Sequence, residues 1–292
     1  MSVITSKMGN KSHSVTLPGG LRIEVRRWPG GGDGAPVLCI PGLTRNARDF
    51  EDVAPAVAAG GRDGAAVSLR GRGGSGYDPV LPNYHPLTYR DDILTVLDAL
   101  GWRRAAFIGT SLGGIVTMLA AAVAPDRVSA AVINDIGPEL APEGIARIVG
   151  YVGGGSRPDA ADIDEAAAQI RAVNAIAFPG RDDAFWRAFA RRTYRQGANG
   201  RWVLDYDQNI GRAMTEAPPA PDLWPAFAAL ADKPTLVVRG ALSDLLTPAI
   251  VEKMRAAHPA FDYCEAAGVG HAPMLDEPDA AAALGAFLER ID

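Results

Sequence analysis

Short apolar runs alternate with helical patterns along most of this chain, and this alternation limits the possible folds more than any other feature of the sequence. Residues 37–40 and 105–108 are continuous apolar runs, which are typical of strands buried on both faces. Strands that alternate with helices form a mostly parallel sheet with helices on both faces. We therefore predict an α/β fold with a central sheet of about eight strands. The predicted strands span residues 21–28, 37–40, 65–69, 105–108, 129–134, 235–239 and 261–266, and the predicted helices span 89–100, 112–123, 248–257 and 278–291.

The alternation is interrupted between about residues 137 and 225. This stretch has helical patterns at 163–175 and 182–194, shows no clear strand, and holds three of the five tryptophans. We predict that it forms a helical cap (a lid), inserted after the sixth strand and lying over the strand ends. The predicted domains are a core, residues 1–136 and 226–292, and this cap, residues 137–225.

Composition and charge argue against several classes of partner. The chain has 29 basic and 34 acidic side chains, so a nucleic-acid partner is not expected. The two cysteines, Cys39 and Cys264, are too few for a disulfide framework. The first fifteen residues lack the apolar core of a signal peptide, so we expect a cytoplasmic location. A small-molecule substrate is the expected partner, and the sequence does not indicate the oligomeric state.

A stretch without charged residues at 105–124 is as long as a membrane span. Glycines cluster in its middle, at positions 109, 113 and 114. Because glycine weakens a helix but permits a sharp turn, we predict a buried strand, a turn and a buried helix instead of a membrane span.

The same stretch contains the motif G-x-S-x-G at residues 109–113, between the predicted strand and the predicted helix. In that context the motif indicates a nucleophilic serine on a very tight turn, and small residues on either side let strand and helix pack closely. We predict that Ser111 is the nucleophile and that its hydroxyl lies at the carboxyl end of the strand. The alternative is a glycine-rich turn that serves packing alone.

A serine hydroxyl is a weak nucleophile and needs a base. Of the four histidines, His271 follows the last predicted strand in a glycine-containing turn, which places it at the same edge of the sheet as Ser111. We predict that His271 is the general base. The structural alternative is a solvated loop histidine.

The base in turn needs a carboxylate, which fixes its tautomer and stabilises the imidazolium. Asp244 follows the predicted strand at 235–239, and Asp135 follows the strand at 129–134. Both positions face the same edge of the sheet as Ser111. We predict Asp244 as the orienting acid and keep Asp135 as the alternative.

Two backbone amides are expected to bind the oxyanion that forms during acyl transfer. Leu112 directly follows the nucleophile at the start of a helix, and Leu43 lies in the turn after the strand at 37–40. We predict these two amides as the oxyanion hole. Three polar residues after this turn either contact a substrate carboxylate or only solvate the loop: Arg45, Asn46 and Arg48.

Residues 71–76 match the dinucleotide-binding pattern G-x-G-x-x-G after a predicted strand. A dinucleotide site requires that this loop open a helix, whose N-terminus holds the pyrophosphate. Prolines at positions 79, 82 and 86 prevent such a helix. We therefore predict a structural loop beside the site, and we expect no cofactor and no metal.

Together these motifs resemble the α/β-hydrolase superfamily over nearly the whole chain, in its capped, serine-dependent esterase and lactonase branch. The motifs that carry the resemblance are Pro41-Gly42-Leu43, residues 70–75, residues 109–113, Ser243-Asp244 and Gly270-His271. The order Ser111, Asp244, His271 is also the order of that family. Many members have His-Gly where this chain has Pro41-Gly42, and Asp-x-Arg-Gly where it has residues 68–71. Neither difference removes a catalytic group.

The resemblance implies a serine hydrolase that cleaves a carboxylic ester, thioester or lactone of a small, moderately hydrophobic substrate through an acyl-enzyme on Ser111. The alternatives are a C–C bond hydrolase of a vinylogous diketone, a cofactor-free lyase or perhydrolase, and a ligand receptor on the same fold. Ser111 argues against the related dehalogenases and epoxide hydrolases, which have aspartate there. Ala272 argues against the C–C bond hydrolases, which commonly have tryptophan after the histidine.

Overall fold

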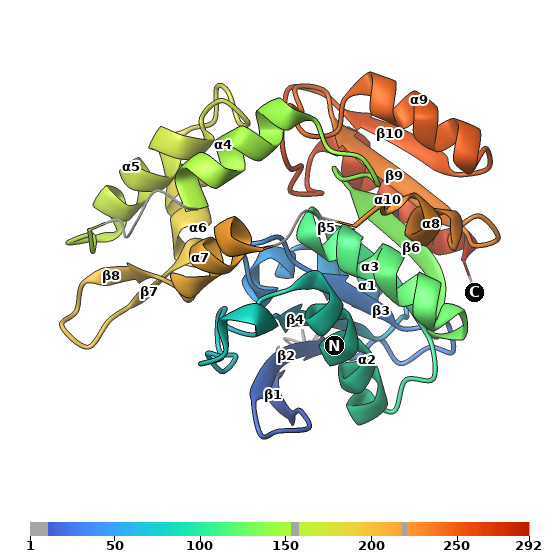
Figure 1. Cartoon of the computed structure of the whole chain (residues 1–292), viewed down its shortest axis with the longest axis horizontal. Helices are drawn as coiled ribbons and strands as arrows, with labels where there is room; N and C mark the ends of the chain where they lie inside the picture. Colours follow the sequence, from blue (N-terminus) through green and yellow to red (C-terminus); the bar gives the residue numbers. More distant parts are fainter. Residues whose placement is uncertain (1–10, 153–157, 218–220, 292) are drawn as a thin grey trace, which may run out of the picture.

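The computed structural model describes residues 11–152, 158–217 and 221–291. Its main element is an eight-stranded sheet in the order β1-β2-β4-β3-β5-β6-β9-β10 (Figure 1). β2 pairs with β1 and β4 in antiparallel fashion, and all pairs from β4 to β10 are parallel. The predicted mostly parallel sheet of an α/β fold is confirmed. The strands are β1 (Lys11–Thr16), β2 (Arg22–Trp28), β3 (Val37–Ile40), β4 (Gly64–Ser68), β5 (Ala105–Thr110), β6 (Val128–Asn134), β9 (Thr235–Gly240) and β10 (Asp262–Ala266).

Helices cover both faces of this sheet. Successive side chains of a strand point to opposite faces, so a continuous apolar strand places apolar side chains on both. Leu38 and Ile40 of β3 belong to the apolar cluster formed with α2, α3, α8 and α9, whereas Val37 and Cys39 belong to the cluster with α1 and α10. All four side chains are fully buried, as the continuous apolar run predicts. The helices are α1 (Val53–Ala59), α2 (Pro86–Leu100), α3 (Leu112–Val123), α8 (Trp224–Ala228), α9 (Pro248–Ala257) and α10 (Pro278–Arg290).

The bounds of β3, α3 and α9 are those predicted from the sequence. α2 begins three residues earlier than predicted. Pro86 suits the first turn of a helix, and the Leu87 amide donates a hydrogen bond to His85 Nδ1, which caps the N-terminus. β1 and α1 were not predicted, and α1, with seven residues, is too short to show a helical period.

The uncharged stretch at 105–124 folds into β5 followed by α3, as predicted. The sharp turn between them divides the stretch into two short buried elements. No helix in the described ranges is long and apolar enough to cross a membrane.

The segment between β6 and β9 holds a group of helices on one side of the molecule (Figure 1). We call residues 137–225 the cap; the division into two domains stays a prediction. The cap also contains a hairpin, so the prediction of a segment without strands is wrong. The hairpin strands have three residues each, too few to show alternation. The cap elements are α4 (Pro142–Val152), α5 (Ile163–Asn174), α6 (Asp183–Thr193), β7 (Tyr194–Gln196), β8 (Trp202–Leu204) and α7 (Asn209–Glu216).

The turn between β5 and α3 holds Ser111 in a strained conformation, with φ 53° and ψ −116°. Glycines on either side allow the close packing that this turn requires. A Cβ atom on Gly109 would lie 2.4 Å from the Gly113 carbonyl oxygen, and a Cβ on Gly113 would lie 2.0 Å from the carbonyl oxygen of Ile40 in β3. The backbone of the first turn of α3 therefore packs directly against both β5 and β3.

We expect Gly113→Ala to lower the free energy of unfolding by about 3 kcal/mol, because the new methyl group would overlap backbone atoms that cannot move freely. A urea titration at neutral pH measures this loss. Gly285→Ala is the matched control, since no atom lies within 4 Å of the position of its Cβ. Gly285 lies on the exposed side of α10, so alanine there should raise the free energy of unfolding by about 0.5–1 kcal/mol. Equal effects of the two substitutions would contradict the packing argument.

Candidate active site

Ser111 and His271, both predicted as catalytic residues, are in contact. The Oγ atom of Ser111 lies 2.9 Å from Nε2 of His271. His271 belongs to the loop after β10, and this loop is held on both sides. The amide of Gly270 donates to the carbonyl oxygen of Ala177 in the cap, and the side chain of Asn134 donates to the carbonyl oxygen of Pro273.

The carboxylate that contacts His271 is that of Asp135, the alternative candidate. Its Oδ2 atom lies 2.8 Å from Nδ1 of His271 and also accepts a hydrogen bond of 2.7 Å from the hydroxyl of Ser243. Its Oδ1 atom accepts from the amide of Gly240 at 2.8 Å. The side chain of Asp135 is fully buried. With Asp135 accepting at Nδ1, the neutral ring carries its proton there and turns the Nε2 lone pair toward Ser111.

Asp244, our preferred orienting acid, has a different place. Both of its carboxylate oxygens accept hydrogen bonds from the guanidinium of Arg147 in α4, at 2.5 and 2.8 Å. The strand order explains the difference: β6, which ends next to Asp135, is the neighbour of β5, whereas Asp244 follows β9, one strand further from Ser111. The hydrogen bond with Arg147 holds the pKa of the Asp244 carboxyl below its ordinary value of 3.8.

Leu43 and Leu112, the predicted oxyanion donors, line the same cavity as Ser111 and His271. Within the described part of the chain, the amides of Leu43 and Leu112 donate to no backbone or side-chain acceptor. Leu112 is the first residue of α3, where an amide has no partner inside the helix. Both amides stay the predicted oxyanion donors.

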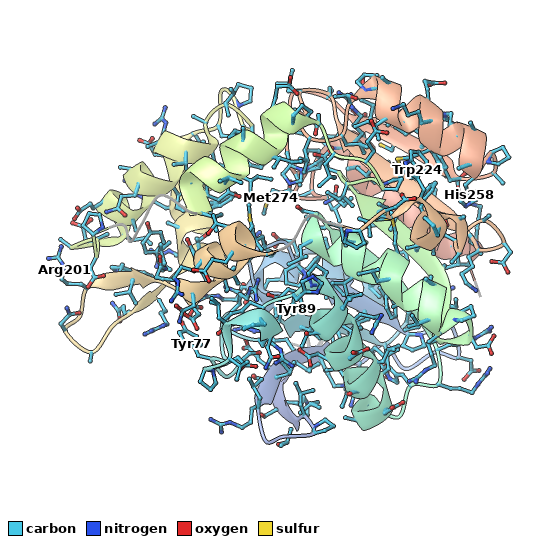
Figure 2. The ribbon with its side chains drawn as sticks, in the orientation of Figure 1. Tyr77, Tyr89, Arg201, Trp224, His258 and Met274 are labelled. Carbon is cyan, nitrogen blue, oxygen red and sulfur yellow. The ribbon has the colours of Figure 1, made fainter. Side chains whose placement is uncertain are left out.

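The cavity beside Ser111 has a volume of about 460 Å³ and mostly apolar walls. Tyr89 and Met274, both labelled in Figure 2, line it from α2 and from the loop after His271. Much of the apolar lining comes from α3, α4 and α7: Ile115, Leu119, Ile145, Ile148, Val149, Ile210, Ala213 and Met214. A site of this kind favours an uncharged, largely apolar substrate.

One polar patch interrupts the apolar wall. Arg45 donates to both carboxylate oxygens of Asp49, at 2.7 and 2.5 Å, and also donates to the hydroxyl of Thr193 in α6. Its guanidinium carbon lies 4.0 Å from the centroid of the Phe189 ring. Arg45, Asp49, Thr193 and Phe189 all line the cavity.

The other two polar residues of the turn after β3 anchor the cap. The side-chain amide of Asn46 donates to the Arg192 carbonyl oxygen at 2.9 Å, and its Oδ1 caps the short 3₁₀ helix Ala47–Phe50. Arg48 forms an ion pair with Asp205 at the end of the hairpin. Of the three polar residues considered from the sequence, Arg45 alone lines the cavity.

Sequence reasoning missed Ser243, Asn134 and Ala177, which hold the acid or the histidine loop. Ser243 was noted only as the neighbour of Asp244. Their roles depend on contacts between residues more than ninety positions apart, for which the sequence carries no local pattern. No group of three or more His, Cys, Asp or Glu side chains within the described ranges is arranged to hold a metal ion.

Comparisons with known proteins place the chain among hydrolases. A family model described as "alpha/beta hydrolase fold" matches residues 35–278. A 3-hydroxybutyrate-oligomer hydrolase of Cupriavidus necator is 32% identical over 271 residues, which cover 89% of this chain and 91% of that protein. A 2-(acetamidomethylene)succinate hydrolase of Mesorhizobium japonicum is 28% identical over 240 residues, or 82% of each chain. The crystal structure of an alpha/beta hydrolase from Novosphingobium aromaticivorans has a TM-score of 0.90 and 42% identity, and the match covers 97% of this chain and 99% of that one.

The ion pair of Asp244 with Arg147 should stabilise the fold in a pH-dependent way. Because the pKa of Asp244 is lower in the folded state, the stabilisation is complete above the unfolded-state pKa and is lost as the pH falls through the folded-state pKa. We expect Asp244→Asn to lower the free energy of unfolding by about 0.5–1 kcal/mol at pH 7, since solvent screens this partly exposed pair.

Urea titrations at pH 7 and pH 3 measure the difference in free energy of unfolding between the wild type and Asp244→Asn, and this difference should be smaller at pH 3. Asp126→Asn is the control, because Asp126 is exposed and forms no ion pair with the described residues. A loss for Asp244→Asn that is the same at both pH values would contradict the role of the carboxylate charge.

Proposed function

This chain belongs to the alpha/beta hydrolase fold family, and from that premise we propose that it hydrolyses a carboxylic ester through an acyl-enzyme on Ser111. The observation that carries the proposal is the hydrogen-bonded row of Ser111, His271 and Asp135 at one wall of an apolar cavity. A hydroxyl, an imidazole and a buried carboxylate that are hydrogen-bonded in this order form the arrangement that activates a serine as a nucleophile.

In the proposed reaction, Oγ of Ser111 attacks the ester carbonyl carbon while Nε2 of His271 takes the hydroxyl proton. The carbonyl oxygen becomes an oxyanion and accepts hydrogen bonds from the amides of Leu43 and Leu112. His271 then gives the proton to the leaving alcohol as the C–O bond breaks, which leaves the acyl group on Ser111. In the second half, Nε2 of His271 takes a proton from a water molecule as its oxygen attacks the acyl carbon. The bond between the acyl carbon and Oγ of Ser111 then breaks, His271 returns the proton to Oγ, and the acid leaves.

Asp135 is the orienting acid of this mechanism, in place of our first choice, Asp244. Its three hydrogen bonds keep the carboxylate fixed while the imidazole gains and loses a proton. The buried negative charge also stabilises the imidazolium, because Coulomb interactions are stronger away from water. Asp244 remains bound to Arg147 and joins the cap to the core.

The substrate we propose is a short ester of a hydroxy acid, as in the 3-hydroxybutyrate oligomers named for the C. necator relative. Such a molecule has apolar methyl and methylene groups that suit the apolar wall, and regularly spaced oxygen atoms that need hydrogen-bond donors. The guanidinium of Arg45 is the polar group that could supply such donors in the cavity wall, through the N–H groups that Asp49 and Thr193 leave unused. The ion pair of Arg45 with Asp49 is neutral overall, which suits an uncharged ester group.

A dicarboxylate such as 2-(acetamidomethylene)succinate is less well supported. It carries two negative charges, which need cationic side chains around them. Arg45 is the only arginine or lysine among the described residues that line the cavity, and Asp49 already neutralises it. The apolar walls therefore favour an ester over a dianion.

A fluorophosphonate probe tests the nucleophile. We expect one adduct on the wild-type protein, detected by intact mass, and none on Ser111→Ala, because the probe phosphonylates only an activated serine hydroxyl. Thermal unfolding should show that Ser111→Ala remains folded. An adduct that persists in Ser111→Ala would disprove the assignment.

Two matched substitutions test the acid. We expect Asp135→Asn to lower kcat by about 10⁴-fold, since asparagine favours the wrong tautomer of the histidine. Asp244→Asn should keep kcat within about tenfold of the wild type, because its carboxylate binds Arg147 and not the imidazole. Steady-state hydrolysis of p-nitrophenyl butyrate measures both. A large loss in Asp244→Asn with little loss in Asp135→Asn would reverse the assignment.

A further inference from the structure

The glycine-rich loop at residues 71–76 connects the core to the cap. The carbonyl oxygen of Gly71 accepts a hydrogen bond of 2.7 Å from the Asp207 amide, and the Gly73 amide donates to the Asp205 carbonyl oxygen at 3.0 Å. Between them, Arg72 forms an isolated antiparallel bridge with Tyr206. The loop backbone thus pairs with the cap just beyond the hairpin strand β8.

The side chain of Arg72 points the other way, into the core. It is fully buried, and its Nε atom donates to the Leu43 carbonyl oxygen at 2.9 Å. Its Nη1 atom donates to the Arg70 carbonyl oxygen at 2.6 Å and to the Tyr89 hydroxyl at 3.0 Å. The guanidinium carbon lies 4.8 Å from the centroid of the Tyr89 ring. Leu43 and Tyr89 are both walls of the cavity, so Arg72 lies directly behind the active-site surface.

The charge of Arg72 is not neutralised in the usual way. No carboxylate among the described residues forms an ion pair with it, and its Nη2 atom is buried without a hydrogen-bond partner in that part of the chain. Burying a guanidinium without a carboxylate is costly. An apolar side chain would fill the same space without this cost, so packing alone does not account for an arginine here.

We propose that Arg72 is a positioning residue for the oxyanion hole. Its hydrogen bond to the Leu43 carbonyl oxygen holds the peptide unit that follows Leu43, and this restrains the turn that carries the Leu43 amide in the cavity wall. The buried positive charge behind the loop also favours negative charge on the cavity side. This inference rests on the proposed ester hydrolysis, because only a reaction with an oxyanion needs that amide held.

Arg70, two residues earlier in the same loop, provides a contrast. It is also buried, but its guanidinium binds Asp92 at 2.7 and 2.5 Å and Asp78 at 2.5 Å. Its charge is neutralised by carboxylates, and its side chain makes no hydrogen bond with Leu43. Arg70 serves the stability of the loop, and it offers a matched control for substitutions at Arg72.

The test compares Arg72→Met, Arg72→Lys and Arg70→Lys in the full-length protein. Hydrolysis of p-nitrophenyl butyrate gives kcat and KM, inhibition by butylboronic acid reports binding of a tetrahedral adduct on the serine, and thermal unfolding reports stability. For Arg72→Met we expect a 10- to 100-fold lower kcat, a KM within threefold, and a parallel loss of boronic acid affinity, because an oxyanion donor acts mainly in the transition state.

Arg72→Lys should recover part of kcat, since its ammonium can still donate to a carbonyl oxygen. Arg70→Lys should lower the unfolding temperature but leave kcat and boronic acid affinity within twofold. If Arg72→Met does not fold, Arg72→Gln takes its place with the same expected losses. The proposal is overturned if the folded Arg72 variants keep wild-type kcat and boronic acid affinity, or if they raise KM alone. A wild-type protein that neither hydrolyses esters nor reacts with a fluorophosphonate would instead overturn the proposed function, and this inference with it.

Discussion

The contact of α3 with β3 at Gly113 is the constraint on which the rest of the site depends. Only a hydrogen atom fits between this residue and the Ile40 carbonyl, and this close approach brings the turn at Ser111 beside the chain that leaves β3. Leu43 lies on that chain, three residues after Ile40. One packing contact between backbones therefore positions both the proposed nucleophile and the proposed oxyanion donors.

Parallel strands bring the other groups to the same edge of the sheet. Residues that follow β6, β9 and β10 meet there, which is why Asp135, Ser243 and His271 come together from positions far apart in the chain. The sequence was sufficient to predict this edge, the turn at Ser111 and the loop of His271, since glycine follows a predicted strand at each place. Those signals are local, so they can be recognised without knowledge of the strand order.

The choice between two aspartates depended on information that is not local. Asp135 and Asp244 both follow strands at the correct edge, but β6 adjoins β5 whereas β9 lies one strand further away. Arg147, which binds Asp244, comes from the cap, and no local pattern predicts which cap residue meets which aspartate. The same holds for Arg72. Its loop was recognised as structural, but its contact with Leu43 becomes apparent only when β3 and β4 are seen side by side.

The hydrogen bond between Gly270 and Ala177 affects how a molecule can enter and leave the cavity. It ties the backbone next to His271 to the loop after α5, so a cap that moved away as one body would pull on the loop that carries His271. Part of the cavity wall also reaches the molecular surface. There Leu87 of α2 and Ile145 and Val149 of α4 are exposed apolar residues that also line the cavity. Under the proposed hydrolysis, a path past these three residues would leave the loop of His271 in place while substrate enters and products leave.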